Sequence, residues 1–172
     1  MDALYIGGGF PETNAIELCR NTGFMRTLKS AIEIGLPVYA ECGGLMFLGR
    51  SIIYNNKSYP MVNALPIDFM MESKPQAHGY TVVNVIGDNP YYSKNTEISG
   101  HEFHYSKVIN INKDSLNFVF KMKRGKGIID HLDGIVYKNV LATYTHTHAL
   151  GCEQWGLGMV ESARKYIKKL GV

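Results

Sequence analysis

The sequence has few cysteines and no long apolar run. Its three cysteines, Cys19, Cys42 and Cys152, are too few for a disulfide framework and favour a reducing compartment. No stretch reaches the about 18 apolar residues of a membrane span, and no basic segment followed by an apolar one opens the chain. We therefore predict a cytoplasmic protein without a membrane partner.

A strong charge excess and nucleotide-binding motifs are also missing. The net charge is +3, and no basic stripe with interleaved aromatic residues indicates nucleic-acid binding. The sequence contains no phosphate loop ending in Gly-Lys-Ser/Thr, and the segment Gly7-Gly8-Gly9-Phe10-Pro11-Glu12 lacks the third glycine of the dinucleotide fingerprint. We expect this chain to bind no cofactor and no ATP.

The residues that are present suit one ordered domain over positions 1–172. The chain is 45% hydrophobic and contains 18 glycines, without low-complexity tracts. The apolar run at 3–6 stops at Gly7, as a buried strand does, and the run at 37–40 is the next expected buried strand. Helical spacing links residues 12–34. Further expected elements are strands at 51–54, 57–61, 79–86, 102–111, 117–122, 135–137 and 141–145, and a closing helix at 153–170. This order predicts a layered α/β fold with a mixed sheet.

Cys42 lies between a buried strand and a helix that begins with Gly43 and Gly44. The start of a helix stabilises a thiolate, and its free N–H groups can receive an oxyanion. Cys42 is therefore the candidate nucleophile, with a buried inert cysteine as the alternative. Cys19 and Cys152 lack such surroundings and are interpreted as packing residues.

His146 and His148 are the candidate bases for this thiol. On a strand, residues two apart point to the same side, so the two imidazoles can act together. An imidazole that takes the thiol proton and returns it to a leaving amine is the usual partner of a catalytic cysteine. A structural role for the histidines remains the alternative.

Four segments carry a family resemblance: residues 5–12 (YIGGGFPE), 40–46 (AECGGLM), 100–106 (GHEFHYS) and 144–146 (YTH). In this order they resemble the glutamine amidotransferase domain of the cobyrinic acid a,c-diamide synthase family, which belongs to cobalamin biosynthesis. The resemblance implies a class I, flavodoxin-like α/β fold whose central sheet is mixed and mainly parallel.

The resemblance also implies the site roles. Cys42 is the attacking thiol, His146 the catalytic histidine, and the oxyanion hole comes from Gly8, Gly9 and Gly43. Class I amidotransferases have a glutamate two positions after the histidine, where this chain has His148, so the third catalytic role is open. His104, Tyr105 and Ser106 are expected along the glutamine pocket, although strand alternation lets only one face of this segment point there.

The implied reaction needs more than this chain. Family members carry a synthetase domain that uses ATP and Mg²⁺ to activate a carboxylate of the tetrapyrrole acceptor. This sequence resembles the amidotransferase part alone, and the resemblance implies a start after the first strand and helix of that part. An exposed sheet edge then predicts a partner, either another copy or the missing part.

Three other functions stay open at this point. The same chemistry can serve a sirohydrochlorin or sirohaem acceptor. The chain can be a non-catalytic assembly module that has kept the fold. A zinc hydrolase with His146 and His148 as ligands is a third possibility, with His101, Glu102 or His104 completing the metal site.

Overall fold

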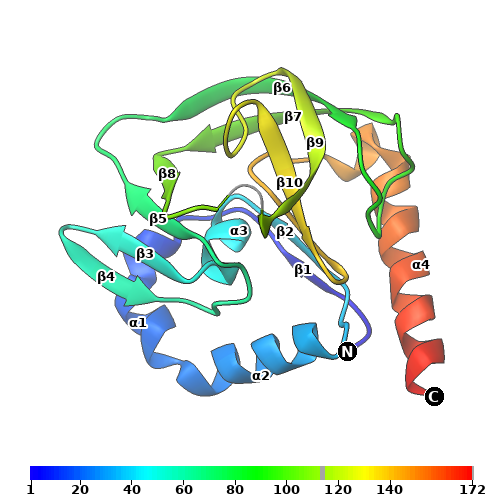
Figure 1. Cartoon of the computed structure of the whole chain (residues 1–172), viewed down its shortest axis with the longest axis horizontal. Helices are drawn as coiled ribbons and strands as arrows, with labels where there is room; N and C mark the ends of the chain where they lie inside the picture. Colours follow the sequence, from blue (N-terminus) through cyan, green and yellow to red (C-terminus); the bar gives the residue numbers. More distant parts are fainter. Residues whose placement is uncertain (113–114, 172) are drawn as a thin grey trace.

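The computed structural model describes residues 1–112 and 115–171 as an α/β fold (Figure 1). The helices are η1 (Pro11–Asn14), α1 (Ala15–Arg20), α2 (Thr22–Glu33), α3 (Gly43–Leu48), η3 (Ala149–Gly151) and α4 (Glu153–Leu170). The strands are β1 (Leu4–Ile6), β2 (Val38–Glu41), β3 (Ser51–Tyr54), β4 (Lys57–Pro60), β5 (Asp68–Met71), β6 (Ala77–Val85), β7 (Glu97–His104), β8 (Ser106–Ile109), β9 (Asn117–Arg124), β10 (Leu132–Tyr137) and β11 (Val140–Thr143). The predicted fold class is confirmed.

The larger sheet has seven strands in the order β1-β2-β11-β10-β9-β6-β7. Only β1, β2 and β11 pair in parallel, and the remaining neighbours are antiparallel. The expectation of a mainly parallel sheet is therefore wrong. Short connections such as the one between β10 and β11 can join only antiparallel strands, whereas parallel strands need a long crossover.

A second sheet of four strands, in the order β4-β3-β5-β8, stands beside the first. The expected hairpin at 51–61 is confirmed as β3 and β4. Strand β5 was not expected from the sequence. The strand predicted at 102–111 is divided into the end of β7 and β8, so this segment contributes to both sheets.

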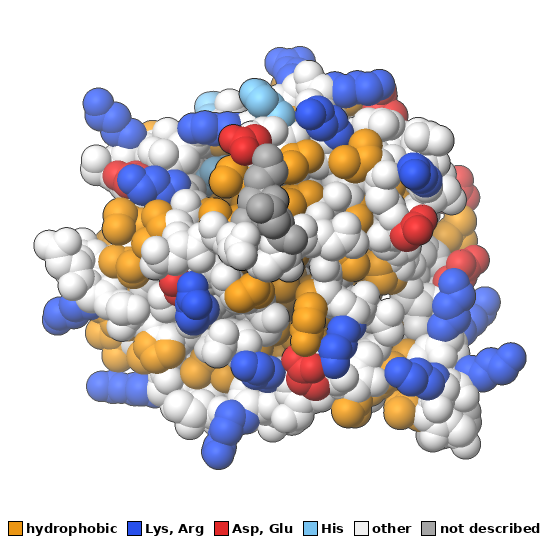
Figure 2. Space-filling view, in the orientation of Figure 1, with side chains coloured by type: hydrophobic (Ala, Val, Ile, Leu, Met, Phe, Trp, Pro, Cys, Tyr) orange, Lys and Arg blue, Asp and Glu red, His pale blue; other side chains and the backbone are white. Residues whose placement is uncertain are grey.

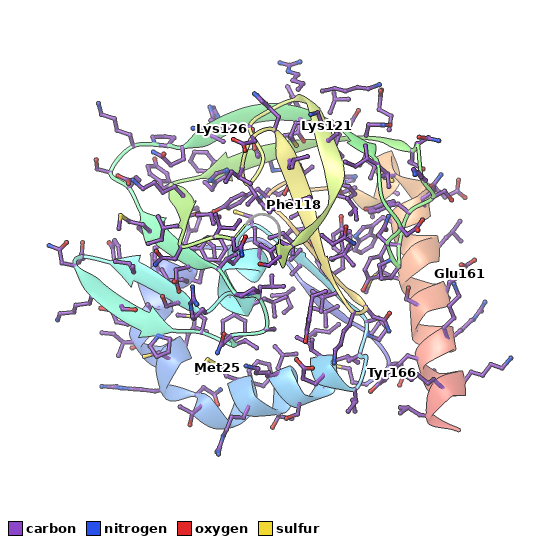
Figure 3. All side chains as sticks on the ribbon, in the orientation of Figure 1. Met25, Phe118, Lys121, Lys126, Glu161 and Tyr166 are labelled. Carbon is purple, nitrogen blue, oxygen red and sulfur yellow. The ribbon has the colours of Figure 1, made fainter. Side chains whose placement is uncertain are left out.

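Alternate residues of β2 join the cores on the two faces of the large sheet. Val38 and Ala40 pack with the buried face of α2, whereas Tyr39 packs with Trp155 of α4. Figure 3 shows Tyr166 on the side of α4 that faces the sheet and Glu161 on its outer side. The closing helix has the predicted bounds, and the sheet lies between two helical layers.

The helix predicted over residues 12–34 is interrupted. Asn21 ends α1, and its side-chain oxygen accepts the backbone N–H of Phe24 at 3.3 Å, which caps α2. An asparagine at this position satisfies a free N–H of the new helix, so the apolar spacing continues through a bend. No helix in the described part of the chain is long and apolar enough to cross a membrane.

Candidate active site

Cys42 occupies a sharp turn between β2 and α3. Its φ is 47° and its ψ is −98°, a combination that costs a non-glycine residue about 1–3 kcal/mol. The turn is fixed from both sides, because Cys42 N–H donates to Thr143 O at 2.8 Å and Cys42 O accepts Met46 N–H at 3.0 Å. Cys42 is 5% exposed, and its thiol donates to Phe103 O at 3.6 Å. The strand, turn and helix predicted around Cys42 are confirmed.

The Gly7 to Gly9 turn, which follows β1, lies against the start of α3. A Cβ atom on Gly43 would lie 2.6 Å from Gly9 O, so the two backbones approach more closely than any side chain permits. The first N–H groups of a helix have no partner within the helix, and here they lie beside a glycine turn. This arrangement suits the predicted oxyanion hole at Gly8, Gly9 and Gly43, which stays a prediction.

His146 reaches the thiol from the far end of the chain. Its backbone forms an isolated antiparallel bridge with His101 of β7, through hydrogen bonds of 2.7 and 3.1 Å. Hydrogen bonding with Cys42, and next with Glu41, raises the pKa of His146 from 6.5 to about 9. The imidazole therefore favours the protonated form beside the sulfur.

The carboxylate beside His146 belongs to Glu41, the last residue of β2. Its Oε2 lies 3.6 Å from His146 Nδ1, and its side chain is 3% exposed. Tyr5 OH donates to Oε2 at 2.9 Å, and Thr147 N–H donates to Oε1 at 3.0 Å. Burial, followed by the charge of Glu41, raises the pKa of Tyr5 to about 12, so this hydroxyl keeps its proton.

A buried carboxylate supports the segment that leads into His146. Asp133 accepts hydrogen bonds from the backbone N–H groups of Gly134, Tyr144 and Thr145 and from the hydroxyls of Thr143 and Thr145. Burial raises the pKa of Asp133 despite these donors. Five donors on one acid group fix the path of the chain immediately before His146.

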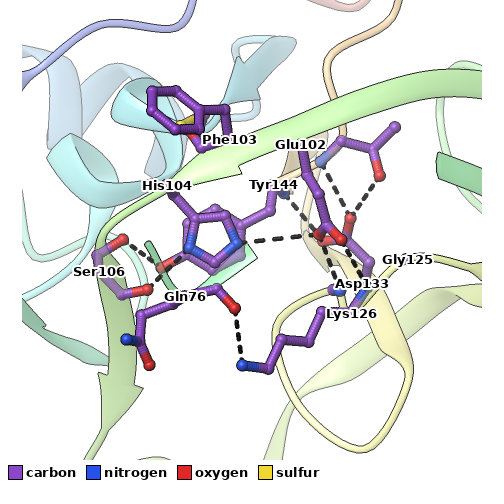
Figure 4. A network of polar contacts seen from close by, with 12 residues as sticks. Gln76, Glu102, Phe103, His104, Ser106, Gly125, Lys126, Asp133 and Tyr144 are labelled. Carbon is purple, nitrogen blue, oxygen red and sulfur yellow. Dashed lines mark hydrogen bonds and ion pairs between the residues drawn. The ribbon is translucent and has the colours of Figure 1, made fainter. Parts of the chain in front are cut away.

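The two faces of β7 have different surroundings, as alternation predicts. His101 stacks on His146 at 4.7 Å between ring centroids, on the face that also carries Phe103. On the opposite side, Glu102 and His104 lie with Tyr144 in a buried polar network (Figure 4). The face with the odd-numbered residues is therefore the one beside Cys42.

This arrangement restricts how the predicted glutamine contacts at 104–106 can operate. The His104 ring stacks on Tyr144 at 3.6 Å, and Ser106 Oγ shares a hydrogen bond of 2.7 Å with Tyr144 OH. Tyr105 instead lies edge-on to Phe103 at 5.6 Å. Glutamine binding by this segment stays a prediction, and at the thiol it would use the backbone or Tyr105 rather than the buried His104 and Ser106 side chains.

His148 does not share a strand face with His146. Strand β11 ends at Thr143, and His148 is an exposed N-cap residue whose Nδ1 accepts Leu150 N–H at 3.3 Å. The expected shared strand face is absent because the chain has already left the sheet. Over residues 1–112 and 115–171, no group of three or more His, Cys, Asp or Glu side chains is placed to hold a metal ion.

Comparison with solved structures supports the fold. A crystal structure of a glutamine amidotransferase has a TM-score of 0.69 and 17% identity, covering 95% of this chain and 80% of that one. A glutamine amidotransferase from Thermotoga maritima has a TM-score of 0.55 and 13% identity, covering 99% and 66%. At such identities the likeness concerns the fold alone.

The sequence family is decided by a match over residues 1–153 to the CobB/CobQ-like glutamine amidotransferase domain. The chain belongs to this family. Cobyrinate a,c-diamide synthase of Methanosphaera stadtmanae is 44% identical over 163 residues, and that of Archaeoglobus fulgidus is 40% identical over 169 residues. The matches cover 95% and 98% of this chain and 35% of each relative. This amidotransferase domain thus spans about a third of the length of those relatives.

Two residues of this amidotransferase domain's site were missed from the sequence. Glu41 and Tyr5 meet only through the parallel pairing of β1 with β2. A signal for Glu41 was present, because an acidic residue interrupts the apolar run at 37–40 directly before the cysteine. An ionisable residue at the buried end of a strand needs partners, and for Glu41 these are Tyr5, Thr147 and His146.

Proposed function

We propose that this chain hydrolyses glutamine at Cys42 and delivers the ammonia to a synthetase that amidates carboxylates of cobyrinic acid. The strained turn that holds Cys42 against His146 is the observation that carries the proposal. The turn places a thiol at the start of a helix, with an imidazole in contact and glycine N–H groups alongside. These are the parts that acyl transfer through a thioester requires.

The proposed reaction begins from the ion pair in which the Cys42 proton already resides on His146, as the raised pKa of this imidazole favours. The thiolate attacks the side-chain amide carbon of glutamine, forming a carbon–sulfur bond while the Gly43 N–H receives the developing oxyanion. The carbon–nitrogen bond then breaks, and the His146 imidazolium gives its proton to the leaving ammonia. Water hydrolyses the thioester to glutamate and restores the thiol.

The acceptor and the energy source belong to the rest of the proposed enzyme. The relatives named cobyrinate a,c-diamide synthase support cobyrinic acid as the acceptor, and most of their length lies outside the matched region. We place ATP and Mg²⁺ binding in that other part. The glycine turn at residues 7–9 has neither the lysine nor the hydroxyl residue of a phosphate loop.

The proposed synthetase contact lies along β1. This strand is at the edge of the seven-stranded sheet, and a groove of about 510 Å³ opens beside it. Phe10 and Phe24 line this groove and are 56% and 50% exposed. On the face in Figure 2, Lys and Arg side chains spread around the periphery with apolar side chains between them.

Ammonia rescue tests the proposal. In an enzyme that joins this chain to its synthetase, we expect Cys42→Ser to abolish amidation supported by glutamine and to leave amidation supported by free ammonia. Cys19→Ser and Cys152→Ser are matched controls that keep both activities. Loss of both activities in Cys42→Ser would assign Cys42 a structural role. Full glutamine-dependent activity in that variant would refute the proposal.

A further inference from the structure

We propose that Glu41 is the positioning residue that orients and charges His146, a role that the sequence had left open at His148. The consequence for catalysis rests on the proposed glutaminase function. The effect of Glu41 on the imidazole can be measured without any activity. The two ideas can therefore fail separately.

The carboxylate of Glu41 is held in one place. It is buried at the end of β2, between the glycine turn and the His146 segment. The Tyr5 hydroxyl fixes Oε2 at 2.9 Å, and the Thr147 N–H fixes Oε1 at 3.0 Å. Since a buried polar group without partners is costly, these two donors hold the carboxylate in position. The imidazole of His146 also lies beside it, with Nδ1 3.6 Å from Oε2.

This contact selects the tautomer of His146. A carboxylate beside Nδ1 favours the form in which Nδ1 carries the proton, which leaves Nε2 to accept the proton of Cys42. Once the thiol proton has moved, the ring is an imidazolium between a thiolate and a carboxylate. Glu41 stabilises this charged state, because an opposite charge within about 4–6 Å favours protonation.

The pKa of the neighbouring His101 shifts in the opposite direction to that of His146. The two rings are stacked 4.7 Å apart with an interplanar angle of 12°. Burial, followed by the charge of His146, lowers the pKa of His101, while that of His146 is raised. The ring in contact with both Cys42 and Glu41 therefore carries the proton, and the stacked ring remains neutral.

His148 cannot take this role in the observed arrangement. It is exposed, its Nδ1 is engaged by Leu150 N–H, and a neutral imidazole supplies no negative charge. The negative charge instead comes from β2, directly before the nucleophile. Nucleophile and positioning residue are thus adjacent in sequence, and the parallel pairing of β2 with β11 brings both to His146.

The first test is an NMR pH titration of the His146 imidazole in the chain of residues 1–172. We expect wild type to titrate near 9. In Glu41→Gln we expect the midpoint to fall by about one unit or more, a tenfold loss of proton affinity. His148→Gln is the matched control and leaves the midpoint unchanged. An unchanged midpoint in Glu41→Gln, or an equal fall in His148→Gln, would overturn the proposal.

A second variant, Glu41→Asp, keeps the proposal testable if Glu41→Gln does not fold. Glu41→Asp keeps the charge and withdraws it by one methylene, so its His146 midpoint should lie between those of wild type and Glu41→Gln. If Glu41→Gln does not fold, as judged by circular dichroism, a wild-type midpoint in Glu41→Asp overturns the proposal.

Kinetics then separate positioning from glutamine binding. In the full enzyme, Glu41→Gln should lower kcat for glutamine hydrolysis at least about tenfold with little change in KM, because the carboxylate contacts the imidazole. Glu41→Asp should recover part of that loss. A rise in KM at constant kcat would mean that Glu41 binds glutamine. Absence of glutamine hydrolysis in wild type would refute the proposed function and leave the titration result intact.

Discussion

At the scale of single residues, the backbone strain at Cys42 is unusual because the surrounding contacts oppose its relief. A cysteine with φ of 47° and ψ of −98° is held by Thr143 on one side and Met46 on the other. Strain of this kind presents the sulfur at the tip of the turn. The strain also lowers the free energy of unfolding, which can be measured.

Comparing Cys42→Ala with Cys42→Gly isolates this strain. At an unstrained position glycine is about 0.5–1 kcal/mol less stable than alanine, whereas strain of about 1–3 kcal/mol at position 42 should reverse the order. We expect Cys42→Gly to unfold at higher urea concentration than Cys42→Ala. A lower midpoint for the glycine variant would show that the turn is unstrained.

The raised pKa of His146 predicts a limit to activity at high pH. Since hydrogen bonding with Cys42 and Glu41 raises it to about 9, the imidazolium that protonates ammonia is present at neutral pH and lost above about 9. Glutamine hydrolysis should therefore decline as the pH rises through about 9. The same proton stabilises the fold fully below pH 6.5, and this contribution is lost as the pH rises to about 9. A rate that declines already between pH 7 and 8 would contradict the prediction.

At the scale of elements, the glycine turn after β1 must fit between His146 and the start of α3. A Cβ atom on Gly8 would lie 2.2 Å from His146 Cε1, whereas one on Gly9 meets nothing within 4 Å. The backbone N–H groups of the turn would survive either change to alanine. Gly8→Ala and Gly9→Ala are therefore matched variants that differ in whether the added Cβ atom meets His146.

Gly8→Ala should displace the imidazole and lower kcat/KM for glutamine about 100-fold, because a shift of about 1 Å in a catalytic group has an effect of this size. Gly9→Ala should have a much smaller effect. Steady-state kinetics with thermal unfolding as a check on the fold would measure both. Equal losses in the two variants would show that contact with His146 is not the reason for the glycine.

The sequence allowed the nucleophile turn to be predicted because its signals are local. An apolar run, a cysteine and two glycines occupy adjacent positions, and the bounds of α4 likewise follow from its own periodicity. Glu41 could not be assigned in this way, since its partner Thr147 is 106 positions away. Sheet direction was also misjudged, because the antiparallel pairs β6–β7, β6–β9, β9–β10 and β10–β11 outnumber the parallel pairs β1–β2 and β2–β11.

At the scale of the whole molecule, β1 forms an edge of the seven-stranded sheet at which another chain could bind. An edge strand leaves unpaired backbone groups that another chain can use. Tyr5 of this strand also holds Glu41, so the proposed docking edge and the active site share a strand. Contact along β1 would therefore bear directly on the carboxylate beside His146.

Hydrogen exchange measures this coupling. In the isolated chain we expect the β1 amides to exchange much faster than those of β2 and β11, and to become protected when the synthetase is added. Light scattering on the same samples separates binding of the synthetase from association of two copies. A monomer whose β1 is already as protected as β2, with no change on addition, would contradict a partner at this edge.

Labelling with a glutamine analogue tests the central role of Cys42 most directly. Treating the protein with 6-diazo-5-oxo-L-norleucine, followed by peptide mass mapping, identifies which thiol attacks a glutamine-shaped electrophile. We expect one label, on Cys42, which glutamine suppresses and which is absent in His146→Ala. Labelling of Cys19 or Cys152 instead, or no labelling of the isolated chain or of its complex with the synthetase, would contradict the assignment of Cys42.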